Sequence, residues 1–214
     1  EKQRSSCVVV GVFESRRLSA AATQLDRASD NYLSTIVRRG DMEGKSGQSL
    51  LLHNVPNLLC DRVLLIGCGR ERDFDDNAYI KAIKQLVDCL NNSGATEASI
   101  YLPDLNVKSR TINWKLQQAV QTIENHLYRF EQLKSNQETV RRPLKKVILN
   151  VPSRRDLADG EKAILQGEAI GKGMQLCRNL GNLPGNICTP TYLAEQAEKL
   201  AEETKKLKTI ILDK

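Results

Sequence analysis

The chain has 214 residues, enough for one large domain or for one domain and part of another. Apolar residues make up 40%, charged residues 27% and aromatic residues 4%, with a net charge of +6, which is ordinary for a soluble globular protein with an aliphatic core. No apolar run approaches the roughly 20 residues of a membrane-spanning helix, and the first residues lack the apolar stretch of a signal peptide.

Five short apolar runs, each bounded by polar residues or glycine, predict strands that are mostly buried on both faces. They cover residues 7–13, 49–55, 62–68, 98–102 and 146–151.

Helical periodicity fills the intervals between these strands. Residues 75–92 repeat apolar side chains at helical spacing after Asp75 and Asp76, and "NNSG" closes this helix. Residues 112–133 predict a longer helix, and 18–39 a shorter helical segment. Strands that alternate with helices predict an α/β domain with a mixed, mostly parallel sheet over residues 1–152.

The segment 153–182 predicts a connecting helix that begins near Asp156 or Asp159. Its expected buried stripe consists of small or medium side chains, namely Ala163, Gly167, Ile170, Gly171 and Met174. Because glycine costs about 1 kcal/mol in a helix relative to alanine, the glycines at 167, 171 and 173 predict close approach to a neighbouring backbone.

Residues 183–214 predict the start of a second α/β domain. After the turn "NLPGN", Thr189 is the expected N-cap of a helix over 190–205, with Pro190 at its first position. This helix is expected to bury Leu193, Ala197, Leu200 and Ala201, and "KTIILDK" to begin a strand. We therefore expect the chain to be part of a longer protein, and the absence of an initial Met leaves room for residues upstream as well.

Two short motifs resemble binding sites only in part. In "IGCGRER", Gly67 and Gly69 follow a strand as in a phosphate-binding loop, but Arg72 replaces the third glycine, so a strand-ending turn is the preferred interpretation. "DFDDN" opens like a calcium loop but fails at its sixth and twelfth positions, so a negatively charged helix start is preferred.

Cysteine and histidine usage gives no sign of a catalytic site. The six cysteines form no C-x-x-C pair and are expected to be reduced core residues of a cytoplasmic protein. Only His53 and His126 are present, far apart in sequence, so a zinc site is not expected. We predict no catalytic, cofactor-binding or metal-binding residue within the chain.

Positive charge is concentrated between Lys108 and Arg155, where eleven Lys and Arg residues stand against three Glu residues. Such a stretch can neutralise DNA phosphates, or it can simply be a solvated surface. No recognition-helix motif or stacking pattern accompanies it.

The stretch "RNLGNLPGNICTPTYLAEQAEKLAEE" resembles the junction of the leucyl aminopeptidase (cytosol aminopeptidase) family, where a connecting helix enters the catalytic domain. The matching residues are Asn182, Pro184, Asn186, Pro190, Leu193 and Ala194. The family often has two prolines in this turn, whereas Gly185 follows Pro184 here. "VVVGVFESRRLS", "RVLLIGCGRERDFD" and "RRPLKKVILNVPSRRDLADGEKAI" resemble the N-terminal domain of bacterial members, so the resemblance covers essentially the whole chain.

The resemblance implies a macro-like layered α/β fold and a cytoplasmic exopeptidase that removes N-terminal residues, often leucine, from peptides. It implies two divalent metal ions, Mn or Zn among them, that activate a bridging water, and a homohexamer. The family's metal-binding motifs, similar to "VGKGLTFDSGG" and "NTDAEGRL", do not occur here, so the metal ligands are expected outside this chain.

Two hypotheses follow. In the first, this region positions and assembles an aminopeptidase but does not itself catalyse. In the second it is a DNA-binding module, as some bacterial members imply through roles in gene regulation and recombination. The candidate DNA-binding residues are Arg141, Arg142, Lys145, Lys146, Arg154 and Arg155. A weaker third possibility is an ADP-ribose-binding module.

Overall fold

A computed structural model describes residues 5–133, 144–204 and 206–212. Its sheet has the strand order β3-β4-β1-β5-β6, with the short β2 paired to the end of β1. The strands are β1 (Val8–Phe13), β2 (Arg17–Leu18), β3 (Ser49–His53), β4 (Arg62–Gly67), β5 (Glu97–Ile100) and β6 (Lys146–Leu149). Strands β4, β1, β5 and β6 run parallel, whereas β3 is antiparallel to β4. The predicted mixed, mostly parallel α/β sheet is thus confirmed.

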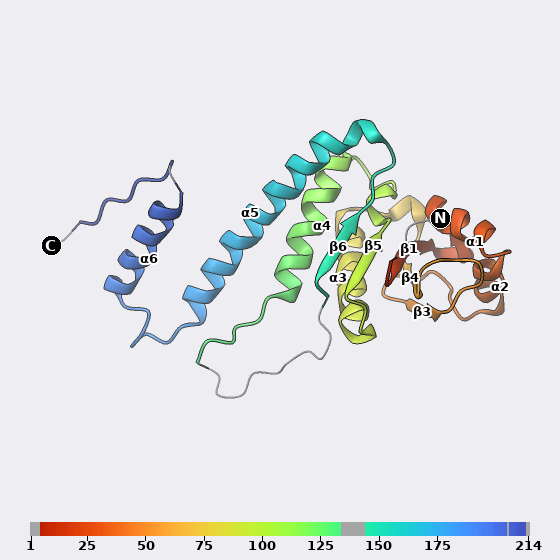
Figure 1. The fold of residues 1–214 in the computed structure, drawn as a ribbon, viewed down its shortest axis with the longest axis horizontal. Coiled ribbons are helices and arrows are strands. Elements are labelled where there is room, and N and C mark those ends of the chain that lie inside the picture. Colours follow the sequence, from red (N-terminus) through yellow and green to blue (C-terminus); the bar gives the residue numbers. More distant parts are fainter. Residues whose placement is uncertain (1–4, 134–143, 205, 213–214) are drawn as a thin grey trace.

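Helices cover both faces of this sheet (Figure 1). They are α1 (Ala20–Ala28), α2 (Tyr32–Arg39), α3 (Asp76–Ser93), α4 (Ile112–Leu127), α5 (Leu157–Asn182) and α6 (Pro190–Glu203). Short 3-10 turns lie at Glu14–Arg16, Glu71–Asp73, Leu102–Asp104 and Arg154–Asp156. No helix in the described part of the chain is long and apolar enough to cross a membrane.

The central strand β1 contributes to two separate cores. Val8, Val10 and Val12 pack with α1 and α2, whereas Val9 packs on the other face with α3 and α4. This division follows from the strand geometry, because successive side chains point to opposite faces. The continuous apolar run of β1 is therefore what a strand buried on both faces requires.

The predicted helix ends agree with the structure where a capping residue is present. The Asp75 carboxylate accepts a hydrogen bond from the Ala78 amide at 2.9 Å and begins α3, and Gly94 ends it with φ +70°. The helix predicted over 112–133 ends earlier, at Leu127, and the segment 18–39 contains two helices rather than one. The break between these two lies at Asp30 and Asn31, both with positive φ.

Helix α5 packs along α4 through its smallest residues. A Cβ atom at Gly167 would lie 2.9 Å from Val120 Cβ, and one at Gly171 would lie 3.0 Å from Glu124 Cβ. The predicted close approach is confirmed at these two glycines but is wrong at Gly173, where a Cβ would meet nothing within 4 Å.

The predicted buried stripe of α5 needs a further correction. Ile170 and Met174 are exposed, and Gly160 takes a buried position that sequence reasoning missed. The buried residues of α5 are Gly160, Ala163, Gly167 and Gly171, so its close packing uses only the smallest side chains.

The last elements agree only in part with the prediction. The Thr189 hydroxyl accepts a hydrogen bond from the Tyr192 amide at 3.3 Å, so the predicted N-cap of α6 is confirmed. The predicted burial is wrong, since Leu193 is 45% and Leu200 40% exposed and no residue of α6 is buried.

The predicted final strand is also wrong for the residues that the structure describes. Residues 208–212 form no strand, and Ile210 and Leu212 are more than four-fifths exposed. A strand requires a neighbouring backbone for its hydrogen bonds, and no described residue supplies one here. The predicted division into 1–152, 153–182 and 183–214 stays a prediction.

Candidate functional site

The carboxyl edge of the sheet is where α/β folds commonly bind ligands. Three loops meet at this edge through backbone hydrogen bonds. The Glu14 amide donates to the Gly69 carbonyl, and the Gly69 amide to the Gly44 carbonyl, both at 2.8 Å. At Gly44 (φ +82°) a Cβ would lie 2.0 Å from the Phe13 oxygen. The glycines of "IGCG" therefore belong to a tightly packed turn, which supports the strand-ending interpretation.

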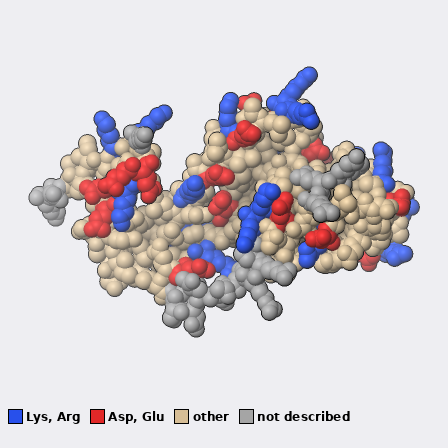
Figure 2. Space-filling view, in the orientation of Figure 1, with Lys and Arg blue, Asp and Glu red and all other residues tan. Residues whose placement is uncertain are grey.

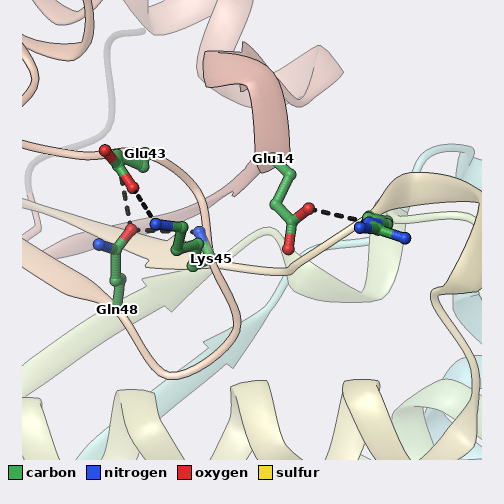
Figure 3. A network of polar contacts seen from close by, with 5 residues as sticks. Glu14, Glu43, Lys45 and Gln48 are labelled. Atoms are coloured by element: carbon green, nitrogen blue, oxygen red, sulfur yellow. Dashed lines mark hydrogen bonds and ion pairs between the residues drawn. The ribbon is translucent and has the colours of Figure 1, made fainter.

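Polar side chains around this turn bond to one another (Figure 3). The Gln48 side-chain oxygen accepts hydrogen bonds from the amides of Glu43, at 3.2 Å, and Lys45, at 3.1 Å. The Lys45 ammonium pairs with the Glu43 carboxylate and lowers its pKa. These groups hold the 43–48 loop in place and need no ligand to do so.

A shallow hollow of about 930 Å³ opens at the same edge, beside β1 and the segment after β4. Its arginines are each matched by a carboxylate: Arg17 pairs with Glu71 at 2.6 Å, and Arg70 with Glu14 at 3.2 Å. Arg72 lies 3.7 Å from Asp73. Since cations and carboxylates balance here, the hollow has no excess positive charge that would attract a diphosphate. The ADP-ribose possibility gains no support from it.

The acidic motif "DFDDN" is used for helix structure. Asp75 caps α3, and Asp76 forms a forked ion pair with the Arg110 guanidinium, which lowers the pKa of the Asp76 carboxyl. Arg110 also stacks over the Trp114 ring at 4.7 Å.

The residues that the structure describes do not fit a metal ion. Across the described ranges, no three His, Cys, Asp or Glu side chains come together in an arrangement that could bind one.

The predicted DNA-binding residues are divided by strand β6. Lys145 and Lys146 lie at its start, where Lys146 is 3.4 Å from Glu97, and Arg154 and Arg155 lie in the turn that follows its end. Arg141 and Arg142 lie outside the described residues. Figure 2 shows basic and acidic side chains interspersed over the face that it draws. The structure therefore does not gather the four described candidates into one cluster.

Sequence reasoning missed one buried cation, Lys115. Its side chain is on the inner side of α4, and its ammonium donates to the Leu105 carbonyl at 2.8 Å. Burial lowers the pKa of this lysine. The Tyr79 hydroxyl donates to the Lys115 carbonyl at 3.0 Å, so the lysine joins α3, α4 and the loop after β5. Lys115 lies within the apolar stripe of residues 112–127, and this position was the sequence signal for its burial.

The far end of the α4–α5 contact is held by a polar cluster that sequence reasoning also missed. Arg178 stacks 3.9 Å from the centre of the Tyr128 ring and donates to the Asn125 carbonyl at 3.0 Å. The Tyr128 hydroxyl donates to Asn179 at 2.8 Å and accepts from Asn182 at 3.2 Å. We call Asn125, Tyr128, Arg178, Asn179 and Asn182 the Tyr128 clamp.

Helices α5 and α6 and the segment 206–212 expose several apolar side chains, which we together call the outer apolar surface. It comprises Leu165, Ile170, Met174, Leu193, Leu200, Leu207, Ile210, Ile211 and Leu212. Figure 1 shows α5 extending past the sheet, with α6 at its far end. Large exposed apolar surfaces of this kind commonly mark a contact with another part of a protein. The fixed helix and this surface form the best candidate functional feature of the chain.

The sequence of the chain is similar to the sequences of one family of known proteins. Residues 9–137 match the family model described as "Cytosol aminopeptidase family, N-terminal domain". The chain is 58% identical over 213 residues to a "Probable cytosol aminopeptidase" of Thioalkalivibrio sulfidiphilus (strain HL-EbGR7), covering all of this chain and 43% of that protein. It is 54% identical over 212 residues to the protein of the same name from Tolumonas auensis (strain DSM 9187 / NBRC 110442 / TA 4), covering 99% of this chain and 42% of that one.

Solved structures show the same fold. A mutant of tomato leucine aminopeptidase superposes with a TM-score of 0.72 at 21% identity, covering 96% of this chain and 41% of that one. The bottromycin maturation enzyme BotP in complex with Mn superposes with a TM-score of 0.67 at 20% identity. The superposition covers 93% of this chain and 36% of that one. The chain thus spans about two-fifths of the length of the curated relatives that it matches.

Proposed function

Because the chain belongs to the cytosol aminopeptidase family, we propose that it is the N-terminal region of an enzyme that removes N-terminal residues from peptides. The proposal includes two divalent metal ions, Mn or Zn, held by residues outside this chain, and a cytoplasmic homohexamer. One of the similar solved structures, BotP, is a complex with Mn, which supports the metal part of the proposal.

Within this enzyme, the chain has a positioning role and does not catalyse. The observation that carries this proposal is the combination of a fixed α5 with the outer apolar surface. The small-residue contact and the Tyr128 clamp set the direction of α5, and Leu165, Ile170 and Leu193 are exposed. This surface is where the remaining part of the enzyme would pack.

An activity assay tests the non-catalytic part. We expect the purified chain to release no product from a leucyl anilide in the presence of Mn²⁺, whereas a protein with the full length of the relatives releases it. Turnover by the chain itself, surviving further purification and lost with a chelator, would overturn this proposal.

Hydrogen exchange tests the positioning part. In the longer protein, the amides of α6 and of residues 206–212 should exchange more slowly than in this chain, because the outer apolar surface is then covered. Those of α3, which lies in the sheet domain, serve as the internal control and should exchange equally in both. Equal exchange of α6 in the two proteins would contradict the packing.

DNA binding is the second proposal, favoured by one observation. Arg154 and Arg155 are exposed and form no ion pair with another described residue, so their charges are available to phosphates. Lys145 and Lys146 form a separate basic pair at the start of β6, and Arg141 and Arg142 lie outside the described residues.

A further inference from the structure

Strand β3 is one edge of the sheet, and its outward side has no partner among the described residues. It pairs with β4 on one side only, in a continuous antiparallel register from Ser49 opposite Ile66 to His53 opposite Arg62. Within the described ranges, no residue outside β4 makes a backbone hydrogen bond to residues 49–53.

Two hydrogen bonds at the ends of this ladder fix which backbone groups face outward. The Gly67 amide donates to the Gln48 carbonyl at 2.8 Å, and the Asn54 amide donates to the Asp61 carbonyl at 3.1 Å. Because the direction of backbone groups alternates along a strand, residues 50 and 52 also bond to β4. The amides and carbonyls of Ser49, Leu51 and His53 therefore point away from the sheet.

The β3 edge lacks three features by which proteins keep edge strands unpaired, namely charged side chains, proline and a bulge. "SLLLH" contains no Lys, Glu or Pro, and its regular register leaves no bulge. Its leucines are only half-buried: Leu50 and Leu52 lie against the α1–α2 core and Leu51 against the α3–α4 core. An additional strand would cover them.

We propose that the β3 edge binds the β3 edge of a second copy of this chain, in an antiparallel pair centred on Leu51. This interaction goes beyond the positioning role and lies on a different surface from the outer apolar surface.

The sequence of β3 favours a second copy over an unrelated peptide. Around a two-fold axis at Leu51, Leu51 faces its own equivalent, Leu50 faces Leu52, and Ser49 faces His53. Leucine thus meets leucine on both faces of the extended sheet, and the three outward residues of each copy exchange amide-to-carbonyl bonds as hydrogen-bonded pairs. A shift of two residues along the strand would place leucines opposite Ser49 or His53 and lose this match.

Sedimentation equilibrium over a range of chain concentrations tests the proposal. We expect a monomer–dimer equilibrium in the unsubstituted chain. His53→Pro removes one outward amide from each copy without touching the β4 ladder, and should raise the dissociation constant about tenfold or more. His53→Ala keeps the amide and should leave the dimer intact.

A cysteine pair checks the register. With Cys177 and Cys188 replaced by Ser, Leu51→Cys should form an intermolecular disulfide under mild oxidation, because Cα atoms in a hydrogen-bonded pair lie about 5.5 Å apart. Leu50→Cys, one position along, should not, since its equivalents lie about 7–8 Å apart diagonally across the pair.

Three results would overturn the proposal. The first is a chain that stays monomeric at every concentration. The second is a dimer that His53→Pro leaves unchanged but Leu165→Lys abolishes, since it then forms through the outer apolar surface. The third is equal cross-linking at positions 50 and 51. Circular dichroism of each variant distinguishes lost pairing from lost folding.

Discussion

At Gly167, the backbone of α5 comes so near α4 that a single methyl group has no room. An added Cβ would lie 2.9 Å from Val120 Cβ and 3.0 Å from the Gln117 carbonyl oxygen. Gly167→Ala should therefore lower the free energy of unfolding by about 1–3 kcal/mol, the usual cost of overpacking. Urea denaturation followed by circular dichroism measures this change.

The same helix provides the matched control. At Gly173 a Cβ meets nothing within 4 Å, so Gly173→Ala should raise the free energy of unfolding by about 0.5–1 kcal/mol through helix propensity alone. Equal effects of the two substitutions would show that α5 does not pack on α4 through Gly167.

The buried thiol of Cys68 makes stability depend on alkaline pH. Burial raises its pKa from 9.0 to about 12. Between these values the unfolded chain loses the proton while the folded chain keeps it, so the stabilisation present below about pH 9 is lost as pH rises toward 12. By about pH 10 this one group should cost about 1 kcal/mol of stability.

Denaturation curves from about pH 8 to about pH 10 check this expectation. Cys68→Ala will lower the free energy of unfolding at every pH by removing buried volume. The further fall in this free energy between the two pH values should be smaller in the variant than in the unsubstituted chain. An identical loss in both proteins would mean that the thiol is not the titrating group. Cys7, whose pKa burial also raises to about 12, contributes in the same direction.

At the scale of the element, the direction of α5 depends on the Tyr128 clamp. Tyr128→Phe keeps the ring under Arg178 but removes the hydroxyl that bonds to Asn179 and Asn182. Because a hydrogen bond contributes about 0.5–1.5 kcal/mol, amides at 178–182 should exchange with solvent about three- to tenfold faster. Mass-spectrometric hydrogen exchange resolves this segment.

Tyr192→Phe is the matched control for this substitution. The Tyr192 hydroxyl, on α6, forms no hydrogen bond with any residue that the structure describes. Its removal should leave exchange at 178–182 unchanged, and an equal increase in both variants would argue against the clamp.

At the scale of the whole molecule, the DNA proposal predicts strong salt dependence. Arg154→Glu together with Arg155→Glu should weaken binding to duplex DNA of any sequence. The slope of log K against log salt should also flatten, by about 0.9 for each phosphate that the protein no longer neutralises. Fluorescence anisotropy at several salt concentrations measures both effects.

Lys84→Glu, an exposed change of charge on α3, serves as the control for this pair. A wild-type slope in the double variant would reject Arg154 and Arg155 as phosphate contacts. The same weakening in Lys84→Glu would point to net charge rather than to a binding surface.

How much the sequence predicted can be seen from particular segments. The runs of β1 and β4 are apolar at every buried position, and Asp75, Thr189 and Gly94 each act within one turn of helix, so these elements were predictable from local chemistry. The junction motif at 182–194 likewise pointed to the family from the sequence alone. Local patterns of this kind depend on neighbours a few residues away.

The features that failed prediction depend on residues far apart in sequence. Gly167 and Gly173 look alike in the sequence, and only the position of α4 decides that one is buried and the other exposed. Tyr128 and Arg178 meet across 50 positions, and the leucines of α6 turned out exposed because no described element covers them. The sequence by itself thus determined the five longer strands of the sheet, the caps and the family. Only the tertiary structure decided which glycines pack, how α5 is held and which edge of the sheet stays open. Each of these depends on contacts between residues that are far apart in the sequence.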